Sequence, residues 1–293
     1  MSNEIIGHEK ISHYLFSMTA DQFPHALLIT GMSGVGKTTL ALHAASRLLA
    51  CAPELVETHS RIIRLTAGYD PKTGAPRAAI PVAAVRDLRT FFNITHQEPL
   101  VILIERAEEL QQESGNALLK IMEEPTRQLY FMILAQSDDS VLQTIRSRCA
   151  TVRLSPVPTQ ILARALEKIT ADRGAIPQAL EIAEGRPGVA IRYLNDAAFH
   201  ERVVSERMRF GELRAARTFA SAEKIIADLF AKKDRHIEAR QELAEMLGWW
   251  LTWLRRDAPQ HPAIAQIART IPLLFENMHP RLLMERVVIE LIA

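Results

Sequence analysis

Cysteine is scarce in this sequence of 293 residues, in which Cys51 and Cys149 are the only two. Two cysteines are too few for a disulfide framework or a four-cysteine zinc site. Neither sign of charge is in excess, since 35 Lys and Arg residues against 34 Asp and Glu residues leave a net charge of +1. This balance argues against the global basic field of a protein that binds DNA on its own. No apolar run reaches membrane-spanning length, and Met1–Glu4 do not begin a basic region leading into an apolar stretch. We therefore expect a cytoplasmic protein.

The remaining composition is ordinary for a folded soluble chain. Hydrophobic residues make up 48% of the sequence and charged residues 24%. At 293 residues the chain is long enough for two or three domains with a substantial core. We find no internal repeat and no low-complexity segment.

Short apolar runs alternate with helix-like segments over about the first 155 residues. Runs such as Val101–Ile104 and Phe131–Leu134 are apolar without alternation, which is typical of strands buried on both faces. Helical patterns lie between the runs, for example at Ser114–Glu124 before Pro125. This order predicts an α/β fold with a five-stranded parallel sheet. The expected strands are Ala26–Thr30, Arg61–Leu65, Leu100–Ile104, Tyr130–Ala135 and Thr151–Leu154.

After Pro156–Pro158 the sequence shows helical patterns only. One helical face in the last third of the chain is formed by Leu243, Leu247, Trp250 and Leu254. This spacing favours a core position for Trp250 and leaves Trp249 and Trp253 as interface candidates. We expect three domains, with a nucleotide-binding α/β domain at 1–155, a small helical lid at 156–198 and an all-helical C-terminal domain at 199–293.

The segment Gly31–Thr38 reads Gly-Met-Ser-Gly-Val-Gly-Lys-Thr and matches the phosphate-binding loop pattern G-x-x-x-x-G-K-[ST]. Its glycines allow backbone conformations closed to other residues, so that N–H groups can approach phosphate oxygens. The expected helix from Lys37 to Ala50 directs its positive end at the same phosphates. On this interpretation Lys37 reaches the β- and γ-phosphates and the Thr38 hydroxyl binds Mg²⁺. The expected nucleotide-binding residues are Gly31, Ser33, Gly34, Val35, Gly36, Lys37, Thr38 and Thr39.

The segment that should complete the nucleotide site departs from the usual pattern. The apolar run Leu100–Ile104 is followed by Glu105 and Arg106, where an AAA+ ATPase has Asp-Glu. Arg106 is a cation and cannot act as a general base, whereas Glu105 can hold Mg²⁺ through a bridging water. We expect ATP or ADP with Mg²⁺ as the ligand, and little or no hydrolysis by this chain alone. A loop that persists only as a structural turn is the alternative.

Several longer motifs carry a resemblance to a known family. They occur in family order over nearly the whole chain, and they are Ile5–His8, Pro24–Leu28, Asn116–Pro125, Ser147–Cys149, Gly185–Ala190 and Pro280–Glu285. On these motifs the chain resembles the AAA+ clamp-loader family, most of all the δ′ subunits of bacterial DNA polymerase III. The segment Asn-Ala-Leu-Leu-Lys…Glu-Glu-Pro, followed about 22 residues later by Ser-Arg-Cys, is far more specific than the phosphate-binding loop alone.

The resemblance implies a RecA-like AAA+ domain, a helical lid and a C-terminal collar domain that holds a ring of subunits together. The implied partners are motor ATPase and delta-type subunits, with the sliding clamp and primer–template DNA contacted through the assembled complex. Arg148 stands at the position of the arginine that reaches the ATP of a neighbouring subunit. The implied role of this chain is therefore an arginine finger supplied in trans, within a DNA polymerase complex.

The departures from the family pattern are also informative. Gln136 stands at the sensor-like position after the fourth strand, where it can hydrogen-bond a phosphate or water. Gly188 replaces a nucleotide-sensing arginine, and Arg192 lies one helical turn further on. The zinc-binding cysteines of the family are missing, so we expect no zinc and no metal site formed by the protein alone.

Three alternatives stay open on the sequence. The chain could be a self-sufficient AAA+ ATPase, a clamp-loader motor or a repair relative, that uses Glu105 or Glu108. A P-loop kinase or transferase would share the loop but gives no reason for Ser147–Cys149 or for a helical C-terminal region. A scaffold in recombination or repair would differ only in its partners.

Overall fold

The computed structural model describes residues 4–69, 77–92, 98–123, 128–230, 236–276 and 278–292. The chain divides into two compact units, one of Met1–Ile176 with Gly185–Ala190 and one of Pro177–Glu184 with Ile191–Ala293. We describe each unit by itself. The segment predicted as a lid, 156–198, is divided between the two units, and the three-domain division stays a prediction.

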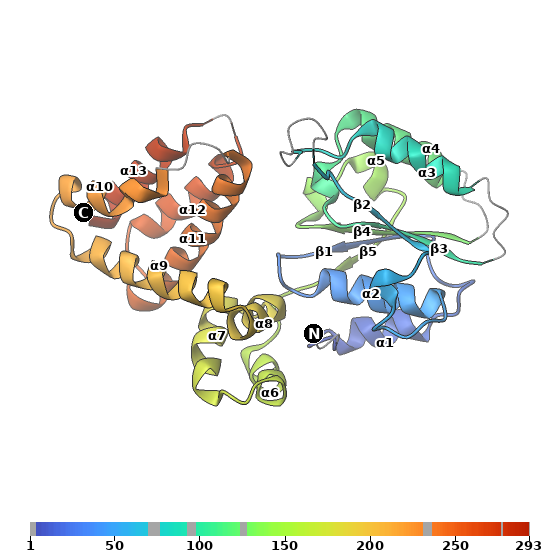
Figure 1. The fold of residues 1–293 in the computed structure, drawn as a ribbon, viewed down its shortest axis with the longest axis horizontal. Coiled ribbons are helices and arrows are strands. Elements are labelled where there is room, and N and C mark those ends of the chain that lie inside the picture. The colour runs from blue at the N-terminus through green and yellow to red at the C-terminus, as the bar shows by residue number, and fades with distance from the viewer. Residues whose placement is uncertain are drawn as a thin grey trace. The chain divides into compact units, whose positions relative to one another are not determined.

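The first unit is built on a parallel sheet with the strand order β2-β3-β4-β1-β5 (Figure 1). All side chains of β1, β3 and β4 are buried, which explains why these segments are apolar without alternation. The sheet confirms the five-stranded parallel architecture expected from the sequence. The strands are β1 Ala26–Thr30, β2 Ile62–Leu65, β3 Leu100–Ile104, β4 Leu129–Ala135 and β5 Ala150–Arg153.

Helices cover both faces of this sheet (Figure 1). Neighbouring strand residues enter different cores: Leu28 packs in one cluster with Val85 and Leu118, whereas Leu27 packs in the other with Leu15 and Leu40. The first cluster includes residues of α3 and α4, and the second includes residues of α1 and α2. The helices of the first unit are α1 Glu9–Ser17, α2 Lys37–Leu48, α3 Val82–Phe92, α4 Gln112–Glu123, α5 Gln143–Arg146 and α6 Thr159–Ile169.

Short turns of 3-10 helix follow several of these elements. They are η1 Val56–Thr58, η2 Ala107–Glu109, η3 Asp138–Ser140 and η4 Arg173–Ala175. The helix expected at Ser114–Glu124 is present as α4, while Glu124 and Pro125 lie outside the described residues.

The second unit is helical. Its elements are α7 Ile176–Ala183, α8 Pro187–Asn195, α9 Ala197–Ala215, α10 Phe219–Ile226, η5 Ala227–Phe230, α11 His236–Asp257, α12 Ala263–Leu273 and α13 Pro280–Ile292. The first residues of α7 and α8 belong to the first unit.

The tryptophans of α11 form the centre of this helical core. Trp250 is fully buried, as its helical spacing predicts. The prediction that Trp249 and Trp253 face a partner is wrong, because they are 3% and 1% exposed. Trp249 packs edge-on against Phe199, and Trp253 packs against Phe210, with ring centroids 5.6 Å apart in both pairs. Helix α11 is therefore contacted from more than one side, so its buried surface is wider than a single apolar stripe.

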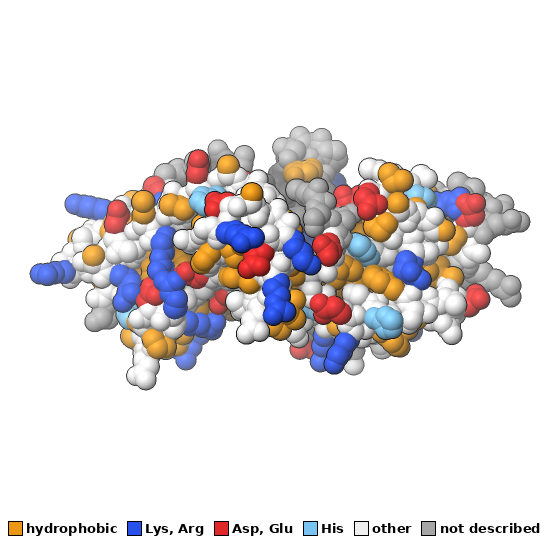
Figure 2. Space-filling model, turned by 90° about the horizontal axis from the view of Figure 1, so that it is seen from below, with side chains coloured by type: hydrophobic (Ala, Val, Ile, Leu, Met, Phe, Trp, Pro, Cys, Tyr) orange, Lys and Arg blue, Asp and Glu red, His pale blue; other side chains and the backbone are white. Residues whose placement is uncertain are grey.

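On the face drawn in Figure 2, Lys and Arg side chains are interspersed with Asp and Glu side chains. This mixture agrees with the net charge of +1. Within the described ranges, no helix has the length and apolar character needed to cross a membrane. The same ranges contain no group of three or more His, Cys, Asp or Glu residues that could hold a metal ion.

Candidate nucleotide-binding site

The phosphate-binding loop begins where β1 ends, between β4 and β5. The Gly31 N–H donates to the Ala135 carbonyl at 3.2 Å, and the Leu154 N–H donates to the Thr30 carbonyl at 2.8 Å. Gly31 has a φ of 148°, and a Cβ at this position would lie 2.5 Å from the Leu154 carbonyl oxygen. The glycine is therefore required by both its conformation and the close approach of β5.

The loop ends at Gly36, the N-cap residue of α2, which has a φ of 110°. Among the described residues no side chain caps α2, so its first-turn N–H groups are open to an anion. Ser33 is exposed and Val35 is fully buried, while Thr38 is exposed on the first turn of α2. Thr39 is half-buried. The loop and the first turn of α2 thus leave N–H groups open at the position where the motif predicts phosphate, and nucleotide binding by these residues stays a prediction.

Lys37 lies over the loop. Its Nζ donates to the Gly31 carbonyl at 2.6 Å and to the Met32 carbonyl at 3.0 Å. Burial lowers the pKa of Lys37, while the negative charge of Glu108 acts in the opposite direction. An ammonium with three donors, two of which are bonded to the loop itself, keeps one donor for a phosphate oxygen.

Helix α8 contacts the loop through its first turn. The Gly188 N–H donates to the Gly34 carbonyl at 2.8 Å, and a Cβ on Gly188 would lie 3.1 Å from that oxygen. The His8 ring lies with Nε2 3.3 Å from the Val35 carbonyl oxygen. Gly188 thus brings the backbone of α8 directly against the backbone of the loop.

Arg192 is held by the second unit. Its Nε lies 3.4 Å from Asp196 Oδ2, its Nη1 lies 3.7 Å from Glu245 Oε1, and its guanidinium lies 4.2 Å from the centre of the Phe199 ring. These contacts give Arg192 local partners on α9 and α11, and none of these partners belongs to the phosphate-binding loop.

Charged residues follow β3, and three of the four form ion pairs. Arg64 of β2 donates to Glu105 at 2.8 Å, and the Nε of Arg106 lies 2.9 Å from Glu109 Oε1. Burial raises the pKa of Glu109, and the charge of Arg106 opposes this effect. Oε2 of Glu108 is buried and has no hydrogen-bond partner among the described residues. Glu105 and Arg106 are therefore each held in an ion pair, Glu105 with Arg64 and Arg106 with Glu109.

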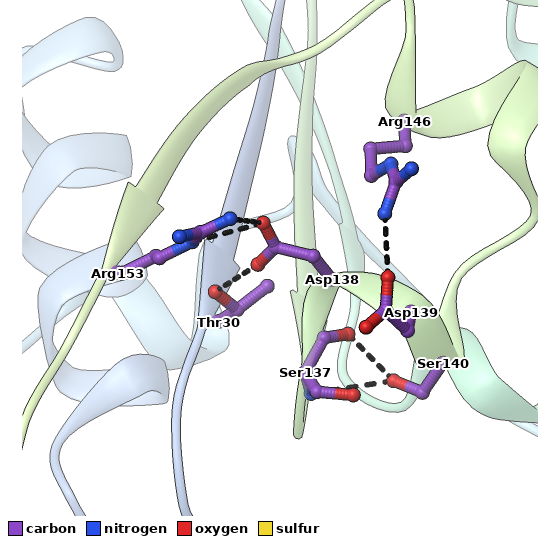
Figure 3. A network of polar contacts seen from close by, with 7 residues as sticks. All are labelled: Thr30, Ser137, Asp138, Asp139, Ser140, Arg146 and Arg153. Carbon is purple, nitrogen blue, oxygen red and sulfur yellow. Dashed lines mark hydrogen bonds and ion pairs between the residues drawn. The ribbon is translucent and has the colours of Figure 1, made fainter.

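A polar network that the sequence analysis did not identify joins the ends of three neighbouring strands (Figure 3). Asp138, after β4, accepts a hydrogen bond from the Thr30 hydroxyl at 2.7 Å and one from Arg153 Nε at 2.9 Å. Both bonds lower the pKa of Asp138, and the bond from Arg153 has the larger effect. Nearby, Arg146 Nη1 lies 2.9 Å from Asp139. Thr30 directly precedes the phosphate-binding loop, so the network fixes the start of that loop.

Gln136 lies exposed directly after β4. Arg148 follows α5, and its Nη2 lies 2.6 Å from Glu123 Oε1 while its Nη1 donates to the Thr144 carbonyl at 3.1 Å. The Arg148 side chain is 41% exposed. The candidate arginine finger is thus a surface residue that is paired with a carboxylate at the end of α4.

Comparisons with known proteins identify relatives of this chain. A family model described as DNA polymerase III, delta subunit, matches residues 7–158. DNA polymerase III subunit delta′ of Escherichia coli K12 is 33% identical over 188 residues, which are 60% of this chain and 56% of that protein. The replication factor C small subunit of Methanococcus maripaludis C7 is 26% identical over 255 residues, which are 85% of this chain and 76% of that protein.

A solved structure agrees with the fold. The DNA polymerase III gamma subunit-related protein of Thermotoga maritima has a TM-score of 0.59 and 14% sequence identity, with 97% of this chain and 98% of that chain covered. This likeness concerns the fold alone. The predicted AAA+ fold class, with its helical C-terminal region, is confirmed.

Proposed function

Because the chain belongs to the DNA polymerase III delta-subunit family, as a clamp-loader AAA+ subunit of the δ′ and replication factor C type, we propose that it acts as a non-hydrolysing member of a clamp-loader ring. In this role it supplies Arg148 in trans to the ATP of a neighbouring motor subunit. Its further partners are a delta-type subunit and, through the assembled complex, the sliding clamp and primer–template DNA. The chain works in the cytoplasm, and residues 199–293 form the collar.

The state of Arg148 is the observation that carries this proposal. The guanidinium is exposed and is held by Glu123, whose side chain is 50% exposed. An exposed ion pair of this kind contributes at most about 1 kcal/mol, so it is readily exchanged for a stronger partner. A triphosphate offers more charge and a geometry that suits the forked donors of arginine.

The phosphate-binding loop supports binding of ATP or ADP with Mg²⁺ by this chain. The loop N–H groups and Lys37 hold the phosphates, and the exposed Thr38 hydroxyl is available to the metal. Bound Mg²⁺ would neutralise phosphate charge. The two positions that usually serve hydrolysis provide no free base, because Arg106 is a cation and Glu105 is paired with Arg64.

One observation favours a second candidate, a self-sufficient ATPase. The Glu108 carboxylate keeps an oxygen without a partner and is close enough to Lys37 to act on its pKa. ATP turnover by the isolated chain that disappears in Lys37→Ala would support this candidate. Absence of turnover by the isolated wild-type chain supports the non-hydrolysing role.

The proposed function is tested by ATP turnover of the ring reconstituted with its motor and delta-type subunits, stimulated by clamp and primed DNA. Arg148→Ala is compared with Arg146→Ala, a nearby arginine that is paired with Asp139. We expect Arg148→Ala to lower turnover by roughly 10³-fold or more, the range known for arginine fingers. Arg146→Ala should have little effect. Equal turnover of the Arg148→Ala and wild-type rings, with assembly confirmed, would exclude the finger.

A further inference from the structure

The Ser-Arg-Cys motif forms the turn that ends α5. This helix has four residues, so all of its carbonyl groups lie in the last turn, where a helix offers them no partner of its own. The Ser147 N–H donates to the Gln143 carbonyl at 3.0 Å. The Arg148 N–H donates to the Ile145 carbonyl at the same distance. The backbone of the motif is therefore bonded directly to the end of α5.

Two side chains of the motif fold back onto the same end of the helix. The Ser147 hydroxyl donates to the Thr144 carbonyl at 3.0 Å, and the Cys149 thiol donates to the Ile145 carbonyl at 3.2 Å. Such bonds from a side chain to the backbone of the preceding turn fix the local conformation. Burial raises the pKa of Cys149 to about 12, so the thiol keeps the proton that it donates. Cys149 also packs against the core cluster that contains Leu118, so the turn is anchored on both sides of its arginine.

The guanidinium of Arg148 shares one of these acceptors. Its Nη1 donates to the Thr144 carbonyl at 3.1 Å, the oxygen that also accepts from Ser147. Its Nη2 lies 2.6 Å from Glu123 Oε1. When the guanidinium exchanges these partners for a phosphate, the bonds of the serine and the cysteine can stay in place. A group whose backbone is already held loses less conformational freedom on binding, so this turn is prepared for the exchange.

We propose that Ser147 and Cys149 are positioning residues for the Arg148 finger. They hold the backbone of the turn at the end of α5, so that only the Arg148 side chain moves when Glu123 is exchanged for a phosphate of the neighbouring ATP. This role rests on the proposed trans function of Arg148 and adds to it the residues that prepare the finger. Neither Ser147 nor Cys149 touches the ATP, and no covalent bond is made or broken through them.

The first test is ATP turnover of the reconstituted ring at saturating ATP, with clamp and primed DNA. Ser147→Ala removes the hydroxyl, whereas Ser147→Thr keeps one. Ser17→Ala is the matched control, because the Ser17 hydroxyl makes the same kind of bond, to the Tyr14 carbonyl at the end of α1, at 2.9 Å. We expect Ser147→Ala to lower turnover roughly 3–10-fold, the equivalent of one neutral hydrogen bond. Ser147→Thr should restore turnover to within about twofold of wild type, which Ser17→Ala should match.

A double substitution shows whether Ser147 acts through the finger. Adding Ser147→Ala to Arg148→Ala should cause no further loss of turnover, because no guanidinium is left to position. On the other side of the turn, Cys149→Ala should lower turnover as Ser147→Ala does, and Cys149→Ser, which keeps a donor, should restore it. Thermal unfolding of each variant, and assembly of each ring, are measured alongside.

The reactivity of Cys149 tests the turn in the isolated full-length chain, without a ring. In a Cys51→Ala background iodoacetamide reports on Cys149 alone, since the chain has two cysteines. Ser147→Ala should raise the labelling rate of the folded chain at pH 8 roughly 3–10-fold above that of Ser17→Ala, because a turn that has lost a bond opens more often.

Three results would overturn this role. They are wild-type turnover of the Ser147→Ala ring where the Arg148→Ala ring is inactive, an additive loss in the double variant, and labelling of Ser147→Ala that is no faster than labelling of Ser17→Ala. Unchanged turnover of the Arg148→Ala ring is a different outcome. It removes the proposed trans function and the finger with it, whereas the labelling rates show separately whether Ser147 holds the turn.

Discussion

Removing the charge of Asp138 tests whether the network beside the phosphate-binding loop stabilises the fold. Asp138→Asn keeps an oxygen that can accept from Thr30 but loses the ion pair with Arg153. A hydrogen bond to a charged group contributes about 1.5–3 kcal/mol. The side chain of Arg153 is 75% exposed, which reduces that value to about 1 kcal/mol. In a unit of this size the loss lowers the melting temperature by about 2–4 °C.

The contribution of Asp138 to the free energy of unfolding depends on pH. Because the pKa of Asp138 is lowered in the folded state, its contribution to the free energy of unfolding is complete at neutral pH. This contribution is lost as the pH falls below about 4, the pKa of a free Asp side chain, and then through the lower pKa that Asp138 has in the folded protein. Urea unfolding should therefore show a gap between wild type and Asp138→Asn at pH 7 that narrows in acid.

Asp139→Asn is the matched control, because Asp139 is 95% exposed and is also paired with an arginine. We expect a change below about 0.5 kcal/mol for this variant. A gap that is equal at pH 7 and in acid, or equal destabilisation by the two substitutions, would refute the reasoning.

Three further predictions concern packing and reactivity. Gly188→Ala places a Cβ 3.1 Å from the Gly34 carbonyl oxygen, so it should weaken the binding of a fluorescent ATP analogue. Gly211→Ala is the control, because a Cβ there has no atom within 4 Å, and it should bind the analogue as the wild type does. Trp253→Ala removes a 1% exposed side chain and should cost about 3–5 kcal/mol in urea unfolding, while a cost below about 1 kcal/mol would contradict its core position. Burial raises the pKa of Cys149 to about 12, so its thiol should resist iodoacetamide at pH 8 until the chain unfolds, and rapid labelling of the folded chain would oppose this.

The sheet could be predicted from the sequence because its central strands are apolar on both faces. β1 and β3 have the predicted bounds, Ala26–Thr30 and Leu100–Ile104. The phosphate-binding loop was equally readable, since its chemistry is local: the glycines, Lys37 and the start of α2 are contiguous in sequence.

Contacts between strands could not be read in the same way. The network of Thr30, Asp138 and Arg153 forms because β4, β1 and β5 are neighbours in the sheet. The sequence of a single segment does not predict the order of the strands. The signal that could have found it is three polar residues at the carboxyl ends of consecutive strands in an assumed AAA+ order. The pairing of Glu105 with Arg64 depends in the same way on β2 lying beside β3.

The prediction for Trp249 and Trp253 failed for a reason of packing. A single face of α11 accounts for Leu247 and Trp250, but Phe199 and Phe210 of α9 cover the adjoining faces. Periodicity within one helix does not show how many neighbours surround it.

The proposed role is that this chain contributes an arginine to another subunit's ATP and is not itself a motor. The most direct measurement compares clamp- and DNA-stimulated ATP turnover of two reconstituted rings, one with Lys37→Ala and one with Arg148→Ala in this chain. We expect the Lys37→Ala ring to keep most of its turnover, while turnover of the Arg148→Ala ring falls by roughly 10³-fold or more. Loss of turnover in the Lys37→Ala ring, with the Arg148→Ala ring unaffected, would contradict it.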